Sequence, residues 1–587
     1  MPSLVRIRKL FRDDETHFVQ LAEHFFRRFF DNEFVSRGGE ARLSVVHILA
    51  ALAVPPILYT FYLIHTYDFI WWNFRGQFAS VALVDHCRYV TFSMVITGLV
   101  AVLEWDAMFL DRRDYAILTP LPLKAGAIFA AKITALLLFL SLFVVDIAAL
   151  PTFFYPLVET IGIGGARVSF LQVCDMIASH GIAVFGASAF SFLFFVAVEG
   201  LLINFLRPRA FKMVSLYVQV LAMVVLLLLL FLLPIISDLL PTWEHTHDVK
   251  LFWLPPFWFV GLYQTLLGSG DALFHSLAQI SLLALGLATL ACAAGYLVNY
   301  KGHTQRALEA SEADPVRRSR LAFAATWLLT RLVLRKPLER AIFFFVARTL
   351  ARSTKHRLYL ATYVGVGFAL AAFGILEALV HSAHGEFAIA VFRPNEALLA
   401  IPLIMSFFIL SGMRIVFTVP AELRANWVFQ LTENEHRQDG FTGVRKAMVV
   451  PVALLFLFLF PLYAALWGWP TAFQHLTLGL LLSLILVELL LMNFRKIPFT
   501  CSYQPGKANI TLLGVFYWFA FTTYAYTMAA LERWLLQDAV RWIVFFVLVL
   551  LALLALVLWR KTMPVVGRSI MFEDDPSPEV QTLGLNT

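Results

Sequence analysis

The sequence predicts an all-α, polytopic membrane protein of about twelve transmembrane helices, arranged as two parallel six-helix repeats, each preceded by an interfacial amphipathic helix. Three observations predict this fold. The chain is 60% hydrophobic and only 14% charged, apolar runs of about 20 residues fill most of it, and short motifs recur in its two halves. Each run is long enough to cross about 30 Å of hydrocarbon. Backbone amides cannot stay unpaired in lipid, so the runs are expected to be helices.

The hydrophobic runs give six candidate spans in each half of the chain. The first set lies at about 43–64, 79–103, 126–150, 179–205, 212–235 and 275–299. The second set lies at about 358–380, 396–418, 447–467, 471–494, 509–530 and 541–559. The two transmembrane halves are therefore predicted at 43–299 and 358–560. An N-terminal segment, a linker and a tail that is expected to be disordered occupy 1–42, 300–357 and 561–587.

Lysine and arginine fall almost entirely on one predicted side of the membrane. The segments on that side hold 39 of them and the opposite loops hold 6, while Arg88 lies just inside a span. By the positive-inside rule, the basic side and both termini are predicted to be cytoplasmic. The expected location is the inner membrane of a bacterium. Topology and contact with anionic lipid headgroups account for the formal charge of +7, so no nucleic-acid partner is predicted.

The two halves carry matching motifs, which indicates a parallel duplication. V-E-G-L-L-I-N-F at 198–205 resembles V-E-L-L-L-M-N-F at 487–494, and both lie at the cytoplasmic end of a fourth span. Before each half, apolar residues recur at one helical spacing, which predicts an amphipathic helix in the membrane interface. The two stripes are Phe18, Leu21, Ala22, Phe25, Phe26, Phe29 and Phe30, and Leu338, Ala341, Ile342, Phe345, Val346, Thr349 and Leu350.

The sequence lacks the nucleotide-binding, metalloprotease and serine-hydrolase motifs that we searched for. It contains no G-x-x-x-x-G-K-[ST] phosphate loop, no H-E-x-x-H and no G-x-S-x-G. We therefore expect no catalytic residue, no metal and no cofactor on this chain. The four cysteines form no C-x-x-C, and Cys87 and Cys174 are expected near the outer face, either as free thiols or as a disulfide.

One cytoplasmic loop carries a family resemblance. Residues 103–123 read L-E-W-D-A-M-F-L-D-R-R-D-Y-A-I-L-T-P-L-P-L, and Lys132 then opens the third span. This stretch resembles the loop of ABC exporter permeases of the second type that contains a coupling helix docking on the ATPase subunit. The resemblance implies that the docking residues of the first loop are Asp111, Arg112, Arg113, Asp114, Leu118, Leu121 and Pro122.

The corresponding loop of the second half, 419–446, aligns more loosely. Arg424 and Trp427 fall on Arg112 and Tyr115, but the Leu-Pro pair is missing. The segment L-P-P-F-W-F-V-G-L-Y-Q-T-L-L-G at 254–268 is similar to the Pro-x-x-Trp segment before the last span of these permeases. In layout the chain resembles double-length putative ABC exporter permeases. That resemblance implies an exporter that is driven by a separate ABC ATPase. Two copies of the ATPase would bind ATP, and the substrate of the exporter is unknown.

Two acidic residues and two other function classes stay open. Glu199 and Glu488 recur at the inner ends of the fourth spans, where they pair structurally with basic residues or carry protons in an ion-coupled secondary transporter. A membrane enzyme or assembly scaffold without transport is the third class. Few charges occur in the spans, which favours a lipid, peptide or other amphiphile if the protein is a transporter.

Overall fold

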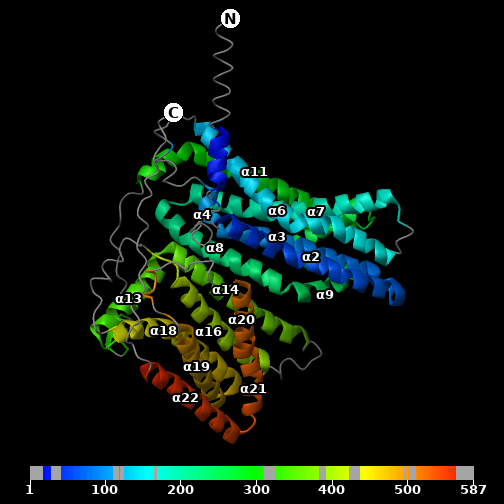
Figure 1. Cartoon of the computed structure of the whole chain (residues 1–587). Coiled ribbons are helices and arrows are strands. Elements are labelled where there is room, and N and C mark those ends of the chain that lie inside the picture. The colour runs from blue at the N-terminus through cyan, green and yellow to red at the C-terminus, as the bar shows by residue number, and fades with distance from the viewer. Residues whose placement is uncertain are drawn as a thin grey trace. The chain divides into compact units, whose positions relative to one another are not determined.

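The computed structural model of the chain describes residues 18–27, 29, 41–109, 118, 125–163, 168–309, 326–331, 333–381, 392–421, 437–492, 494, 496–500 and 510–562. Among these residues, every regular element is a helix (Figure 1). The chain divides into two compact units, Met1–Asp314 and Pro315–Thr587. The boundary between them falls inside the linker predicted at 300–357.

The first unit is a bundle of long helices joined by short turns. Residues 18–27 are helical and precede it. Its elements are α2 (Ala41–Asn73), η1 (Arg75–Gln77), α3 (Phe78–Leu103), α4 (Trp105–Met108), α6 (Ala125–Ile163), α7 (Phe170–Phe205), α8 (Pro208–Phe231), α9 (Leu233–His245), η3 (Val249–Phe252), α10 (Pro255–Leu266) and α11 (Ala272–Glu309).

The second unit is built from the same kind of helix. Its elements are α13 (Pro337–Arg352), α14 (Thr354–His381), α16 (Glu396–Val416), α18 (Arg437–Trp467), α19 (Trp469–Leu491), α20 (Ile510–Thr522), η5 (Thr523–Thr527), α21 (Met528–Leu535) and α22 (Ala539–Thr562). The element η5 is a π-helical turn that joins α20 to α21.

Eleven helices in the described part of the chain are long and apolar enough to cross a membrane, so the protein is a multi-pass membrane protein. They overlap eleven of the twelve predicted spans, although the first and third extend about ten residues beyond their predicted ends and the fourth begins nine residues earlier than predicted. The remaining one, predicted at 509–530, is helical but divided between α20, η5 and α21. The π-helical turn inserts extra backbone into this span, and apolar periodicity alone does not reveal such a turn.

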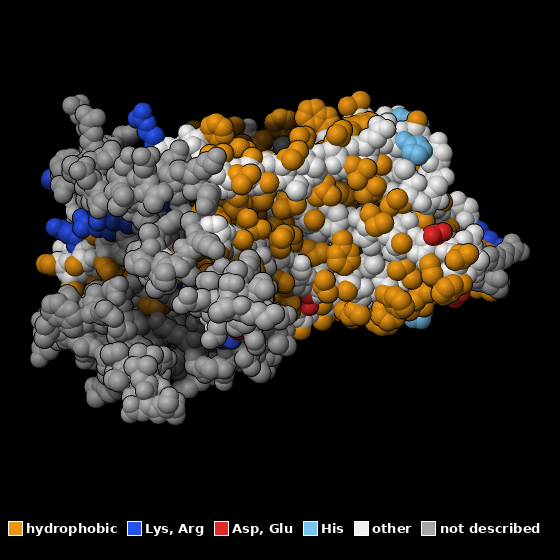
Figure 2. All heavy atoms as spheres, turned by 90° about the horizontal axis from the view of Figure 1, so that it is seen from above, with side chains coloured by type: hydrophobic (Ala, Val, Ile, Leu, Met, Phe, Trp, Pro, Cys, Tyr) orange, Lys and Arg blue, Asp and Glu red, His pale blue; other side chains and the backbone are white. Residues whose placement is uncertain are grey.

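The outer surface of the helices is apolar, as contact with lipid requires. On α22, Val540, Leu548 and Leu554 are all more than half exposed. The face drawn in Figure 2 is covered over most of its visible length by hydrophobic side chains, with charged side chains gathered mainly near its ends. A soluble protein rarely exposes apolar patches of more than a few hundred Å², so hydrocarbon is the solvent that this surface fits.

The fourth spans of the two units pack in a similar way, whereas the first spans differ, since α2 packs mainly on α6 and α14 mainly on α16. In the first unit α7 packs against α3 and α6, and in the second unit α19 packs against α16 and α18. Helices α7 and α11 approach closely at two glycines, since a Cβ on Gly200 would lie 3.3 Å from the Cα of Gly295. Small residues of this kind let transmembrane helices come into backbone contact.

The outer excursion predicted at 236–274 contains two helices that pack back onto the bundle. Helix α10 contacts α3, α7 and α11, and it buries Phe257, Phe259 and Tyr263 almost completely. Its twelve residues span about 18 Å, which is too short to cross the membrane. The Pro-x-x-Trp segment is therefore part of the core of the first unit.

The apolar stripe predicted for 338–350 divides between two environments. Ile342 and Val346 of α13 are buried in the core of the second unit, where the helix packs on α18, whereas Ala341 is exposed. The backbone of Glu339 comes close enough to Gly443 of α18 that a Cβ there would lie 2.6 Å from the Glu339 carbonyl oxygen. Helix α13 thus binds its own unit with one side only.

The predicted orientation is testable by cysteine labelling. Cys87 is buried and Cys174 is exposed, and both are free thiols, so the four native cysteines are first changed to serine. In that background, a membrane-impermeant maleimide applied to intact cells should modify His245→Cys and spare Ala310→Cys. The charge asymmetry places residue 245 outside and residue 310 inside. Labelling at residue 310 with protection at residue 245 would show that the topology is the reverse of the predicted one.

Candidate functional site

Most residues that the family resemblance implies for ATPase docking lie outside the described residues. These are Asp111, Arg112, Arg113, Asp114, Leu121, Pro122, Arg424 and Trp427. Leu118 is described, and it is 9% exposed. The structure does describe the points from which both loops begin, at the ends of α3 and α16 that the charge pattern predicts to be cytoplasmic.

The first loop begins from a buried aromatic anchor. Trp105 of α4 is fully buried, and its indole Nε1–H donates to Ser215 Oγ of α8 at 2.9 Å. The Tyr296 hydroxyl of α11 donates to the Met108 carbonyl at 2.6 Å, and its ring stacks on Phe109 with centroids 4.5 Å apart. The start of the loop is therefore held by the fifth and sixth spans of the first unit.

The second loop begins from a comparable anchor. The Phe499 N–H donates to the Phe417 carbonyl, and the Ala421 N–H donates back to the Phe499 carbonyl, each at 3.0 Å. His356 Nε2 donates to the Val419 carbonyl, also at 3.0 Å. The segment after the fourth span and the first turn of α14 therefore hold this loop.

Both anchors occupy the same position in the loop alignment. The register that places Arg424 on Arg112 also places Phe417 on Trp105, and these aromatic side chains are 1% and 0% exposed. Each lies where a second span ends and a loop begins. A force applied to either loop would act on several packed spans at once, because protein interiors are close-packed and transmit strain.

The two repeated acids have different surroundings. Glu488 of α19 accepts from Arg445 Nε of α18 at 3.3 Å and from Arg560 Nη1 of α22. Glu199 of α7 is 3% exposed. The residue that follows it, Gly200, contacts α11, whereas the matching Leu489 is 49% exposed. The two arginines give Glu488 a structural pairing that joins α18, α19 and α22.

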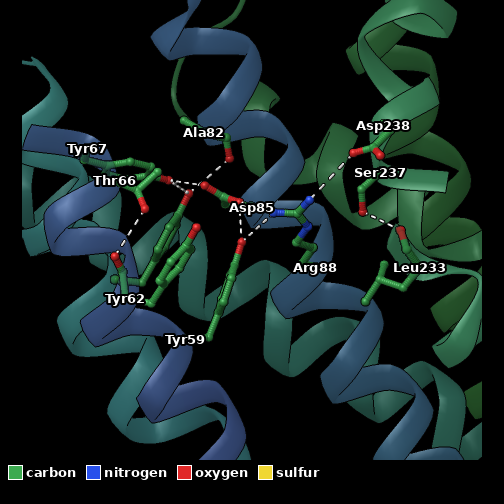
Figure 3. A network of polar contacts seen from close by, with 11 residues as sticks. Tyr59, Tyr62, Thr66, Tyr67, Ala82, Asp85, Arg88, Leu233, Ser237 and Asp238 are labelled. Atoms are coloured by element: carbon green, nitrogen blue, oxygen red, sulfur yellow. Dashed lines mark hydrogen bonds and ion pairs between the residues drawn. The ribbon is translucent and has the colours of Figure 1, made fainter. Parts of the chain in front are cut away.

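A buried ionic network that the sequence analysis missed lies near the predicted outer end of the first unit (Figure 3). Asp85 of α3 is its centre and has a side chain that is only 1% exposed. It accepts from Arg88 Nη1 at 2.9 Å, from Tyr67 Oη at 2.9 Å and from the Tyr59 hydroxyl. Asp238 of α9 approaches Arg88 Nη2 at 3.9 Å from a solvent-exposed position.

Two buried histidines lie beside this network. The Nδ1 atoms of His86 and His180 are 2.9 Å apart, so one ring donates to the other. Tyr263 of α10 stacks on His86 with centroids 3.8 Å apart, and its hydroxyl donates to Glu159 Oε2 at 2.9 Å. The Nε2 atom of each histidine has no hydrogen-bond partner among the described residues. Together with Asp85, this cluster brings two acids and two histidines into the spans.

The second unit buries a histidine of its own. His475 Nδ1 of α19 lies 3.0 Å from both carboxylate oxygens of Glu532 on α21. In the same unit, Tyr524 of η5 places its hydroxyl 3.0 Å from Ser406 Oγ and 3.0 Å from Ser483 Oγ. Among the described residues, no group of three or more His, Cys, Asp or Glu side chains is arranged to hold a metal ion.

These polar clusters bring together residues far apart in the sequence. The sequence did contain an indication of the Asp85 network, because Asp85, His86 and Arg88 are three polar residues within four positions of an apolar span. Intramembrane ionisable residues are functional candidates by default. Their partners come from α2, α6, α7, α9 and α10, and no spacing in the sequence identifies them.

Comparison of the chain with protein-family models, with curated proteins and with solved structures finds no match.

The Asp85 network yields a prediction about stability. Asp85→Asn removes the carboxylate beside Arg88 and leaves two tyrosine hydroxyls with a poorer acceptor. We expect the free energy of unfolding to fall by about 1–3 kcal/mol. The measurement is thermal unfolding of the purified protein in detergent, followed by circular dichroism.

Asp238→Asn is the matched control for this substitution. It makes the same chemical change beside the same arginine, but the Asp238 side chain is 79% exposed. The control should change stability by less than about 1 kcal/mol, because exposed ion pairs contribute little. Equal losses in the two variants would show that the buried network does not stabilise the bundle.

Proposed function

We propose that this chain is the permease subunit of an ATP-driven exporter in the bacterial cytoplasmic membrane. Two parallel six-helix repeats form the transmembrane part, and both termini lie in the cytoplasm. A separate ABC ATPase, in two copies, docks on the two cytoplasmic loops at 104–125 and 419–446. The transported molecule is an amphiphile, since few charges lie in the spans.

The observation that carries this proposal is the anchoring of both loops. Trp105 and Phe417 are buried at equivalent positions, and hydrogen bonds tie each loop start to neighbouring spans or to the segment that follows them. A loop that delivers work from a motor needs a stiff base, because a flexible tether would absorb the movement. A simple solvated connector has no such requirement.

The packing of the two units supports a duplicated design. The lysine that opens each third span is covered by the amphipathic helix that precedes its half. Lys132 lies over the rings of Phe25 and Phe29, at 5.1 and 4.9 Å from their centroids. Lys446 donates to Glu339 of α13 and, at 2.7 Å, to the Val333 carbonyl. Two equivalent halves would supply the two docking surfaces that a pair of ATPase subunits needs.

An ion-coupled secondary transporter is a second candidate, and the buried cluster around Asp85, His86 and His180 favours it. Glu488 is a poor proton carrier in this scheme, because two arginines occupy its carboxylate. Proton-driven substrate flux into liposomes that contain this chain and no ATPase would select the ion-coupled mechanism over the ATP-driven one.

The first loop is predicted to carry most of the coupling. We expect Arg112→Glu with Arg113→Glu to abolish co-purification of the ATPase and transport, because reversed charges oppose docking on a complementary surface. Membrane insertion should be unaffected, since the pair lies in a predicted cytoplasmic loop. The measurements are pull-down from detergent-solubilised membranes and transport, both normalised to protein abundance.

Two controls accompany that double substitution. Arg317→Glu with Arg318→Glu reverses a second adjacent arginine pair in the predicted cytoplasmic linker, and it should retain the ATPase. Arg424→Glu should have a smaller effect than the first pair, because the second loop lacks the Leu-Pro segment. Normal transport by the Arg112→Glu, Arg113→Glu protein at wild-type abundance would refute the assignment of the coupling loop.

The purified chain alone is predicted to hydrolyse no ATP. The sequence lacks a phosphate loop to cradle the nucleotide phosphates. Phosphate release by protein purified in strong detergent should equal that of a blank preparation, whereas gentle purification should restore activity together with a bound ATPase. Hydrolysis that persists in the stringently purified chain would contradict the proposal.

A further inference from the structure

Helix α13 presents two chemically different sides. The side formed by Glu339, Ile342, Phe343 and Val346 is buried in the second unit. The other side is open and carries Arg340, Arg348 and Arg352, all of them exposed. At about 100° per residue, these three arginines fall within about 120° of the helix circumference. They form one basic stripe along a helix of 16 residues.

A hollow of about 860 Å³ lies along this open side. Its walls include the three arginines together with Phe344, Phe345 and Thr349. Arg348 extends over Phe344, with the guanidinium carbon 5.6 Å from the ring centroid. Aromatic rings alternate here with cationic groups, so the hollow offers both an apolar floor and several N–H donors.

The charge in this hollow is of one sign. No acidic side chain occurs among its described lining residues. The acid of α13, Glu339, lies on the buried side and is engaged by Lys446. One turn beyond Ser353, at the start of α14, Arg357 has a buried Nε without a hydrogen-bond partner among the described residues. The hollow is therefore complementary to an anion.

The position of the hollow favours a membrane lipid as that anion. Helix α13 ends at Arg352, and the membrane-spanning helix α14 begins at Thr354 after a single residue. The basic stripe therefore lies at the level where a span leaves the hydrocarbon. Phosphate groups of lipids lie at that level, and arginine binds phosphate through paired N–H donors. Phenylalanine beside the arginines matches the acyl chains that accompany such a phosphate.

We propose that the open side of α13 binds the headgroup of an anionic phospholipid. Arg348 and Arg352, one turn apart, hold the phosphate, and Arg340 adds positive charge about 12 Å further along the helix. Phe344 and Phe345 contact the adjoining acyl chains. The site requires only that the second unit lies in a membrane, so it is independent of any ATPase partner.

The test uses the full chain, purified in a non-ionic detergent and titrated with dioleoyl phosphatidylglycerol or dioleoyl phosphatidylcholine. Native mass spectrometry counts the bound lipid. Wild-type protein should bind phosphatidylglycerol about tenfold more tightly than phosphatidylcholine, since each basic residue near an anionic headgroup adds attraction. The triple variant Arg340→Gln, Arg348→Gln, Arg352→Gln should reduce this preference to less than about twofold.

Two further variants show whether charge alone explains the preference. Arg207→Gln, Arg393→Gln, Arg541→Gln removes three exposed arginines elsewhere and should keep the wild-type preference. Arg340→Lys, Arg348→Lys, Arg352→Lys keeps the charge but loses the paired donors, and it should give an intermediate preference. If the glutamine triple variant aggregates, Arg348→Gln and Arg352→Gln are tested singly, each with an expected loss of about threefold.

Three outcomes would overturn the lipid site. The first is an unchanged preference in the glutamine triple variant. The second is displacement of phosphatidylglycerol by glycerol 3-phosphate at equal concentration, which would assign the arginines to a free phosphate. The third comes from cross-linking in membranes. A cross-linker attached to the cysteine of the Ala341→Cys variant would capture a protein, and a photoactivatable lipid would not label this position. That result would assign the open side of α13 to a protein partner.

Discussion

Hydrocarbon offers no hydrogen-bond partner, and the rest of this structure depends on that constraint. Backbone groups inside the membrane must bond within their own helix, which is why long helices account for the regular structure of the described residues. Polar side chains obey the same condition locally. Thr60 donates to the Pro56 carbonyl at 2.8 Å and Thr91 to the Cys87 carbonyl at 2.7 Å, so neither hydroxyl faces lipid unpaired.

Ionisable side chains in the spans take partners from other helices as well as from their own. Asp85 draws its donors from two helices, with Tyr59 and Tyr67 on α2 and Arg88 on α3. Glu159 draws its donor from α10. These contacts fix the relative positions of α2, α3, α6 and α10, whereas apolar contacts alone would specify those positions less strictly. The cost of placing charge in the membrane is thus offset by contacts that specify which helices become neighbours.

Helix positions were predictable because length and composition decide them one segment at a time. The sequence therefore identified α3, α16 and α22 to within a few residues. Helix α10 was not recognised as helix, because a short, mostly apolar run that begins with two prolines fits an excursion equally well. The π-helical turn at Thr523–Thr527 was also missed; the hydroxyl of Tyr524 within it hydrogen-bonds to Ser406 on α16 and to Ser483 on α19. The local sequence pattern does not reveal contacts between residues that are far apart in the chain.

The candidate sites also differ in whether the sequence could predict them. The loops proposed for docking were predicted from motifs, because the residues of such a motif are contiguous in the sequence. The anchors beneath them were not, since Trp105 bonds to Ser215 and Phe417 to Phe499, more than 80 residues away in each case. Glu199 and Glu488 show that similar motifs can lie in different surroundings. Gly200 against Gly295 and the exposed Leu489 explain that difference.

Helix α7 gives the first unit a mechanical property. It runs unbroken through 36 residues without a proline, whereas α2 and α6 each contain two prolines. His180 and Glu199 lie 19 residues apart on this helix, a distance of about 28 Å along its axis. Backbone contact at Gly200 joins α7 to α11, so a tilt of one helix would be transmitted to the other. A small rotation at the anchored loop start would therefore reach the buried histidines at the opposite end as a sideways displacement.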